Sequence, residues 1–322
     1  MVEEILPNLY KIEIPLPQSP LKALNSYLIK AEGRFLVIDT GMNREECMRE
    51  MSSNLERLDV DLEKTDFFIT HLHTDHLGLV ANLATDTSTV YFNRQEASAL
   101  NFHKYWQEII AFYRLNGFPE DELKKSLESH PGYRYGLKGH VDFCILEEGS
   151  TIEIGDYCFR CVETPGHSPG HMCLYEANKK LLVSGDHILF DITPNISLWS
   201  EEKNSLKEYL ASLDKVYDLE VNLVLPGHRR LSNQHRKRIA ELKQHHQNRA
   251  DEVLSVLQGG EKTAFQIAPL MRWDVDYSSW ELFPSSQKWF AVGETLSHLK
   301  YLEEDGLVRR KMNEGKIVFS LD

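Results

Sequence analysis

The sequence has no apolar run long enough to span a bilayer, and its first residues lack the basic and apolar segments of a secretory leader. Cysteine is scarce: the five residues at positions 47, 144, 158, 161 and 173 form no disulfide framework. Cys158 and Cys161 are three residues apart in an expected strand, where they would point to opposite faces. These absences predict a cytoplasmic protein with reduced cysteines and no membrane contact.

Positive charge is also in deficit, because 36 Lys and Arg stand against 49 Asp and Glu, for a formal net charge of −13 at pH 7. Broad nucleic-acid or anionic-membrane surfaces need a basic excess, so the composition argues against both as partners. The hydrophobic fraction of 42% is ordinary for a globular protein. At 322 residues the chain is long enough for one large domain and one small one.

The most informative segment reads Thr-His-Leu-His-Thr-Asp-His from residue 70 and follows a short apolar run that predicts a buried strand. Alternation along an extended chain would bring His71, His73 and Asp75 to one side, with His76 where the chain can turn into a helix. Three imidazoles and a carboxylate are costly to bury unpaired, and a divalent metal would satisfy them together.

Three later strand-like segments end in a similar way. Thr-Pro-Gly-His presents His167 in a tight loop, Ser-Gly-Asp presents Asp186, and Pro-Gly-His presents His228. Asp39 also ends an expected strand, either as a functional carboxylate or as a turn cap. Ligands drawn from the ends of several strands at one rim of a sheet are typical of a site built on a rigid scaffold.

Seven nitrogen and oxygen donors are too many for one catalytic zinc, which takes three protein ligands and a water. We therefore expect two Zn²⁺ ions per chain, with iron or manganese as alternatives. His71, His73 and His167 are assigned to one ion, Asp75, His76 and His228 to the other, and Asp186 to a bridge between them. Two such ions can share a hydroxide with a pKa near neutrality, and Asp75 with this hydroxide is the expected catalytic residue.

Together these motifs resemble the metallo-β-lactamase superfamily over about residues 5–230. The resemblance implies an α/β fold, a four-layer αββα sandwich with the dimetal site at one edge of its two sheets. It also implies that Asp39 stands behind the metal ligands. The segment from Thr164 to His171 is similar to glyoxalase II-like thioesterases and to lactonases.

For the domains, we expect a catalytic domain over residues 1–230, with an aromatic-rich helical cap inserted at about 94–140. Tyr133, Tyr135 and Lys138 of this insertion are candidate substrate contacts.

Residues 231–322 predict a connector helix, with His246 on a solvated face, followed by a small winged-helix-like domain. From residue 250 onward there are 8 Lys and Arg against 12 Asp and Glu, and the one basic cluster is Arg309–Lys311. This balance favours packing or homodimerisation over RNA binding for the small domain.

The resulting hypothesis is a metal-dependent hydrolase that uses a dizinc-bound hydroxide on a small ester, thioester or lactone. One alternative is an endoribonuclease acting on single-stranded RNA, which the winged-helix resemblance motivates. Another is a mononuclear iron oxidoreductase resembling persulfide dioxygenases, which reuse similar motifs.

Overall fold

The computed structural model describes residues 1–100, 102–274, 277 and 279–322. Its contacts divide the chain into two compact units, the first made of Met1–Leu100, Tyr135–Pro194 and Ser212–Arg238, the second of Asn101–Arg134, Asn195–Ala211 and Ile239–Asp322. Among the described residues, no helix is both long and apolar enough to cross a membrane.

The first unit contains a seven-stranded sheet in which the strands follow one another in chain order. These strands are β1 (Val2–Leu6), β2 (Leu9–Pro15), β3 (Ala23–Ala31), β4 (Arg34–Ile38), β5 (Thr65–Phe68), β6 (Val90–Asn93) and β7 (Phe143–Leu146). β1 to β4 pair antiparallel, and β4 to β7 pair parallel. β5 is buried along its whole length, as expected for a strand with a parallel neighbour on each side, and its one charged residue, Asp66, accepts hydrogen bonds from Arg34.

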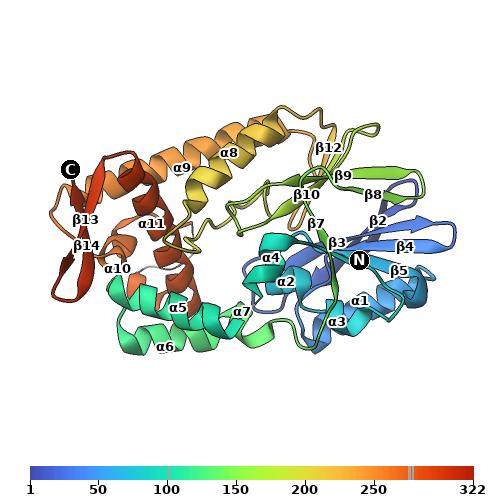
Figure 1. The fold of residues 1–322 in the computed structure, drawn as a ribbon, viewed down its shortest axis with the longest axis horizontal. Helices are drawn as coiled ribbons and strands as arrows, with labels where there is room; N and C mark the ends of the chain where they lie inside the picture. The colour runs from blue at the N-terminus through green and yellow to red at the C-terminus, as the bar shows by residue number, and fades with distance from the viewer. Residues whose placement is uncertain (101, 275–276, 278) are drawn as a thin grey trace. The chain divides into compact units, whose positions relative to one another are not determined.

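A second sheet of five strands has the order β12-β11-β10-β9-β8. Its strands are β8 (Thr151–Ile154), β9 (Tyr157–Glu163), β10 (Met172–Glu176), β11 (Leu181–Gly185) and β12 (Leu223–Pro226). One apolar cluster joins both sheets: Ile38 and Phe68 of the first pack with Phe159, Leu174 and Val183 of the second. The sheets therefore face each other across a shared core (Figure 1).

Helices cover the outer faces of the first unit. α1 (Glu45–Arg57) packs on β2, and α3 (Val80–Leu83) lies on the same side of the first sheet (Figure 1). The C-terminal part of α8 (Ser205–Tyr217), from Ser212 on, belongs to this unit, and its Lys215 donates a hydrogen bond to the Glu163 carbonyl at the end of β9. The short helices α2 (Thr74–Leu77) and α4 (Arg94–Ala99) follow β5 and β6.

The second unit is mainly helical. It contains α5 (Phe102–Leu115), α6 (Glu120–Ser129), most of α7 (Pro131–Tyr135) and of α9 (His235–Leu257), α10 (Ala264–Ile267), α11 (Ser285–Glu304) and the hairpin β13 (Val308–Asn313)–β14 (Lys316–Leu321). The helices share one core around α11, in which Trp289 stacks on Tyr113 with ring centroids 4.2 Å apart. A Cβ on Gly293 would lie 2.4 Å from the Tyr113 hydroxyl, so only glycine fits there.

The domain division differs from the expected one. Most of the 94–140 insertion groups with the C-terminal unit because Ile109, Phe118 and Leu123 share a core with Trp289 and Val292. The C-terminal hairpin turns between Asn313 and Lys316, which pair with each other. The winged-helix assignment of this region stays a prediction.

Two other expectations were incomplete or wrong. β1 and β7 were not anticipated, because neither segment alternates clearly between apolar and polar residues. His246 is 1% exposed, not solvated: its Nδ1 lies 3.3 Å from Nε2 of His298 and its ring contacts Tyr209. As expected, Cys158 is exposed and Cys161 buried on opposite faces of β9.

The core between the sheets gives a first testable prediction. Phe159 is fully buried there, so Phe159→Ala should lower the free energy of unfolding by about 3–5 kcal/mol through lost burial and a cavity. Cys158→Ala, on the exposed face of the same strand, should stay within about 0.5 kcal/mol of the wild type. Urea unfolding followed by circular dichroism measures both, and equal effects would contradict the described register.

Candidate metal centre

Seven side chains predicted from the sequence meet at one edge of the first unit, in two groups. His71, His73, His167 and Asp186 form the first group, and Asp75, His76 and His228 form the second; within each, one donor atom per residue lies within 4.8 Å of the others. His71 and His73 stand in the turn after β5, and Asp75 and His76 in α2. His167 is in the β9–β10 loop, while Asp186 and His228 closely follow β11 and β12.

The secondary structure that positions Asp75 differs from the expected one. β5 ends at Phe68, before the motif, and Asp75 lies in the first turn of α2. Strand alternation therefore does not place Asp75 beside His71 and His73. Instead, the helical turn puts Asp75 and His76 next to His228.

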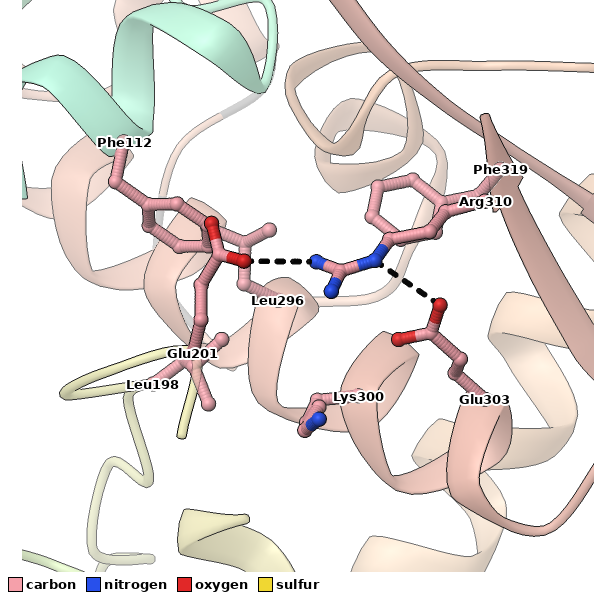
Figure 2. Close-up of a pocket in the computed structure, with 8 residues that line it drawn as sticks. All are labelled: Phe112, Leu198, Glu201, Leu296, Lys300, Glu303, Arg310 and Phe319. Atoms are coloured by element: carbon pink, nitrogen blue, oxygen red, sulfur yellow. Dashed lines mark hydrogen bonds and ion pairs between the residues drawn. The ribbon is translucent and has the colours of Figure 1, made fainter. Parts of the chain in front are cut away.

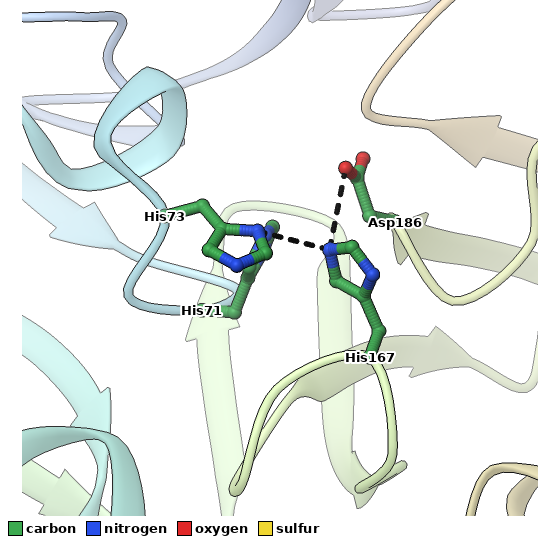
Figure 3. Close-up of side chains that lie close together, drawn as sticks. All are labelled: His71, His73, His167 and Asp186. Atoms are coloured by element: carbon green, nitrogen blue, oxygen red, sulfur yellow. Dashed lines mark hydrogen bonds and ion pairs between the residues drawn. The ribbon is translucent and has the colours of Figure 1, made fainter. Parts of the chain in front are cut away.

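In the first group the ring nitrogens converge on a common point (Figure 3). Nδ1 of His73 lies 3.0 Å from Nε2 of His71 and 3.0 Å from Nε2 of His167, and Oδ2 of Asp186 is 3.6 Å from the latter. Burial lowers the pKa of His73 to about 3 and that of His71 well below its usual value. These imidazoles are therefore neutral and can offer lone pairs at neutral pH.

The second group is richer in negative charge. Nε2 of His228 lies 3.3 Å from Oδ2 of Asp75 and 3.5 Å from Oδ2 of Asp186, and Nε2 of His76 is 3.5 Å from Oδ1 of Asp186. Burial lowers the pKa of His228, but Asp186 and Asp75 outweigh it and raise this pKa to about 10. Asp186 therefore reaches both groups, one oxygen of its carboxylate facing His76 and the other facing His167 and His228.

Buried polar atoms without hydrogen-bond partners show whether the site suits a metal ion. Oδ2 of Asp75, Nε2 of His76, Oδ1 of Asp186 and Nε2 of His228 are buried and have no hydrogen-bond partner in the described chain. Such atoms are costly to bury unless another group completes them. All four face the same small space, and imidazole and carboxylate are suitable ligands for a divalent cation. The donor set therefore fits divalent metal binding.

The outer nitrogens of two histidines are held by the protein. Nδ1 of His76 donates to Oδ2 of Asp39 at 2.7 Å, and Nδ1 of His228 donates to the Ala23 carbonyl at 2.7 Å. Because these bonds keep a proton on Nδ1 of each ring, Nε2 is the nitrogen that points into the site and can give up its proton to bind an ion. Asp39 also accepts from the amide and hydroxyl of Thr70, so it is more than a turn cap.

His171 is a supporting residue that the sequence reasoning missed. Its Nε2 accepts the backbone N–H of Asp186 at 3.1 Å, and its Nδ1 lies 2.8 Å from the Thr164 hydroxyl. It is fully buried, so it fixes the backbone that carries the bridging carboxylate. Its position in the same Pro- and Gly-rich loop as His167 was the available signal.

The three candidate substrate contacts of the insertion take different positions. Tyr133 is 54% exposed and lies edge-on to Trp106, whereas Tyr135 lies beneath the guanidinium of Arg44. Lys138 is exposed. Their role in substrate binding stays a prediction.

Comparisons with known proteins agree with this fold and site. The family model described as the metallo-beta-lactamase superfamily matches residues 21–228. The probable metallo-hydrolase YqjP of Bacillus subtilis (strain 168) is 25% identical over 307 residues, which cover 91% of each chain. The human protein named acyl-coenzyme A thioesterase MBLAC2 is 24% identical over 217 residues, 63% of this chain and 72% of that protein.

Among solved structures, a metallo-beta-lactamase family protein from Thermus thermophilus has a TM-score of 0.80 and 28% identity, covering 99% of this chain and 100% of its own. A beta-lactamase domain protein from Burkholderia ambifaria has a TM-score of 0.84 and 25% identity, covering 100% and 94%. The similarity to both therefore extends over both units.

The two groups predict the metal content. Protein purified without chelator should hold about two divalent ions per chain. His73→Ala and His228→Ala should each leave about one, and Asp186→Asn should leave fewer than one because it serves both groups. His140→Ala, whose side chain is 87% exposed, is the control. Elemental analysis of each protein measures this, and a single ion in the wild type would contradict it.

Because the histidine pKa values shift in opposite directions in the two groups, the affinity for an ion should depend on pH in the second group but not in the first. In metal-free protein, His76 and His228 hold protons below their raised pKa values, so an ion entering the second group must displace them. The affinity of the second group for a divalent ion should therefore rise between pH 6 and pH 8, by roughly tenfold or more per pH unit. The first group, where the pKa of His73 is lowered to about 3, should bind with little change over this range.

Chelator competition on two variants separates the groups. His73→Ala retains the complete second group, and His228→Ala retains the complete first group. Equal pH dependence of zinc affinity in both variants would contradict the prediction.

Proposed function

The chain belongs to the metallo-β-lactamase superfamily, and we propose that it is a dinuclear metal hydrolase, with zinc as the expected metal, acting on a small thioester, ester or lactone. The observation that carries this proposal is the Asp186 carboxylate, whose two oxygens face both groups of donors. One ion would engage only part of the set of seven donors, whereas two ions would engage all of it.

When bound, two divalent ions would supply an activated water and polarise the substrate carbonyl. The protein's own residues would set their positions. Asp39 and the Ala23 carbonyl hold the tautomers of His76 and His228, and His171 fixes the backbone of Asp186. Because these contacts are formed within a rigid scaffold, little reorganisation would accompany the reaction.

Asp75 is the proposed catalytic residue. Burial raises its pKa, but His76 and His228 outweigh this effect and lower it to about 2, so the carboxylate is ionised at neutral pH. Its Oδ2 is buried and would accept a hydrogen bond from the attacking water, orienting a lone pair toward the carbonyl carbon. With a thioester, the carbon–oxygen bond to water forms, the carbon–sulfur bond breaks, and a proton from the water ends on the leaving sulfur.

A thioester is the substrate class with the most support. The relative named as an acyl-coenzyme A thioesterase shares 24% identity over 63% of this chain. The segment from Thr164 to His171 is similar to thioesterases and lactonases, and it supplies both His167 and the supporting His171. Lactones and simple esters need the same attack on a carbonyl carbon, so they belong to the same proposal.

Charge pairing in the second unit argues against the ribonuclease alternative. Arg310, in the middle of the basic cluster, lies 3.3 Å from Glu201 and 3.1 Å from Glu303 (Figure 2). Lys311 pairs with Glu261 at 2.5 Å. These partners offset the positive charge that phosphate binding would need. The mononuclear iron alternative would leave the second group of donors without a function.

A substrate panel tests the proposal. We expect hydrolysis of acyl-coenzyme A, other thioesters, lactones or aryl esters, with a loss of at least about 100-fold on metal removal and recovery with zinc. Asp75→Asn should lower kcat by about 10²–10⁴-fold, while His140→Ala should match the wild type. Cleavage of short RNA alone, or one iron per chain with oxygen consumption, would overturn the function.

A further inference from the structure

Glu96 is a fully buried carboxylate in the first turn of α4, outside both groups of metal donors. Its Oε2 accepts the backbone N–H of Leu72 at 2.6 Å. Its Oε1 accepts the hydroxyl of Ser168 at 2.7 Å and the backbone N–H of Gly170 at 2.5 Å. The three hydrogen bonds engage both oxygens of the buried carboxylate.

The partners of Glu96 belong to the two loops that supply the imidazoles of the first group. Leu72 stands between His71 and His73, and Ser168 directly follows His167. The two loops are almost a hundred residues apart in the chain, so Glu96 links them through space. Through these bonds Glu96 holds the loop segments that carry the ligands.

Close packing limits how far the second loop can move. A Cβ on Gly170 would lie 2.2 Å from Oδ1 of Asn93, which caps α4 by accepting the backbone N–H of Gln95 at 2.7 Å. The loop backbone therefore rests directly on the first turn of the helix that carries Glu96. The same loop continues to His171, which holds the backbone of Asp186.

We propose that Glu96 is a positioning residue that sets the spacing of His71, His73 and His167 and thereby the affinity of the first group for its ion. This inference rests on the metal centre of the proposed function, and it concerns that centre's assembly, not the substrate. The second group is held differently: Asp39 orients His76, and the Ala23 carbonyl orients His228. A substitution of Glu96 should therefore lower the affinity of the first group for its ion more than that of the second group.

Glu96→Gln is the informative substitution because it keeps the size of the side chain. Its single carbonyl oxygen can serve either Leu72 or the Ser168 and Gly170 pair, and its NH₂ group then faces the other donors. One loop loses its hydrogen bonds and shifts relative to the other. Glu176→Gln is the matched control: Glu176 is 1% exposed and accepts the backbone N–H of Lys179 in the β10–β11 turn, away from both ligand loops.

The experiment compares zinc affinities by chelator competition in wild type, Glu96→Gln and Glu176→Gln, with Co²⁺ absorption spectra as a second readout. In Glu96→Gln we expect one of the two ions to bind about 10–100-fold more weakly and the other within about threefold of the wild type. The His228→Ala substitution leaves only the first group complete, so adding Glu96→Gln to it should show the full loss of zinc affinity. The His73→Ala substitution leaves only the second group complete, so adding Glu96→Gln to it should change the zinc affinity very little.

Several outcomes would overturn the proposal. Wild-type affinities for both ions in a folded Glu96→Gln variant would do so, and so would an equal loss of both. If Glu96→Gln does not fold, Ser168→Ala removes one of the three donors and should weaken the same ion by several-fold; no change would overturn the inference. Failure of the proposed function appears instead in the wild type, as a missing second ion or as absent hydrolysis.

Discussion

Buried charge is the constraint on which the first unit depends. Two carboxylates and five imidazoles are gathered at one edge of the sheets, and most are almost fully buried. Carboxylates in such a place are stabilised only by nearby positive charge, since desolvation opposes them. Without metal, protons on His76 and His228 supply that charge, which is why their pKa values are raised. A divalent ion would take over the same role, so metal binding and stability of this edge are linked.

The two-sheet scaffold explains how such a cluster can be maintained. Donors come from the ends of β5, β11 and β12 and from the β9–β10 loop, so both sheets contribute. Their relative position is set by the shared core and by bonds across it. The Tyr27 hydroxyl of β3 donates to the Pro226 carbonyl at 2.7 Å, and the Asn25 side chain donates to the same carbonyl at 3.0 Å. The segment carrying His228 is thus anchored to the opposite sheet.

Local signals explain which parts of the site could be predicted from the sequence. His71 to His76 lie within six residues, and His167, Asp186 and His228 each follow a glycine, so composition and spacing were informative. Glu96 and the burial of His246 depend on contacts between segments far apart in the chain, which periodicity does not report. The grouping of the 101–134 segment with α11 could not be predicted for the same reason. The periodicity of an amphipathic helix predicts an apolar face, but it does not predict which element packs against that face.

The two groups of donors differ in a way that bears on their chemistry. The first presents three imidazoles and shares one carboxylate, whereas the second adds Asp75 and has Asp39 behind His76. An ion in the second group would therefore face more negative charge, and its Lewis acidity would be more strongly offset. The ion in the first group would retain more of its charge for polarising a substrate oxygen. By this reasoning, in the proposed hydrolase the carbonyl oxygen would lie on the side of His71, His73 and His167, and Asp75 would orient the attacking water from the other side. The shared Asp186 would then keep the two roles at a fixed separation, which the loops hydrogen-bonded to Glu96 would help to define.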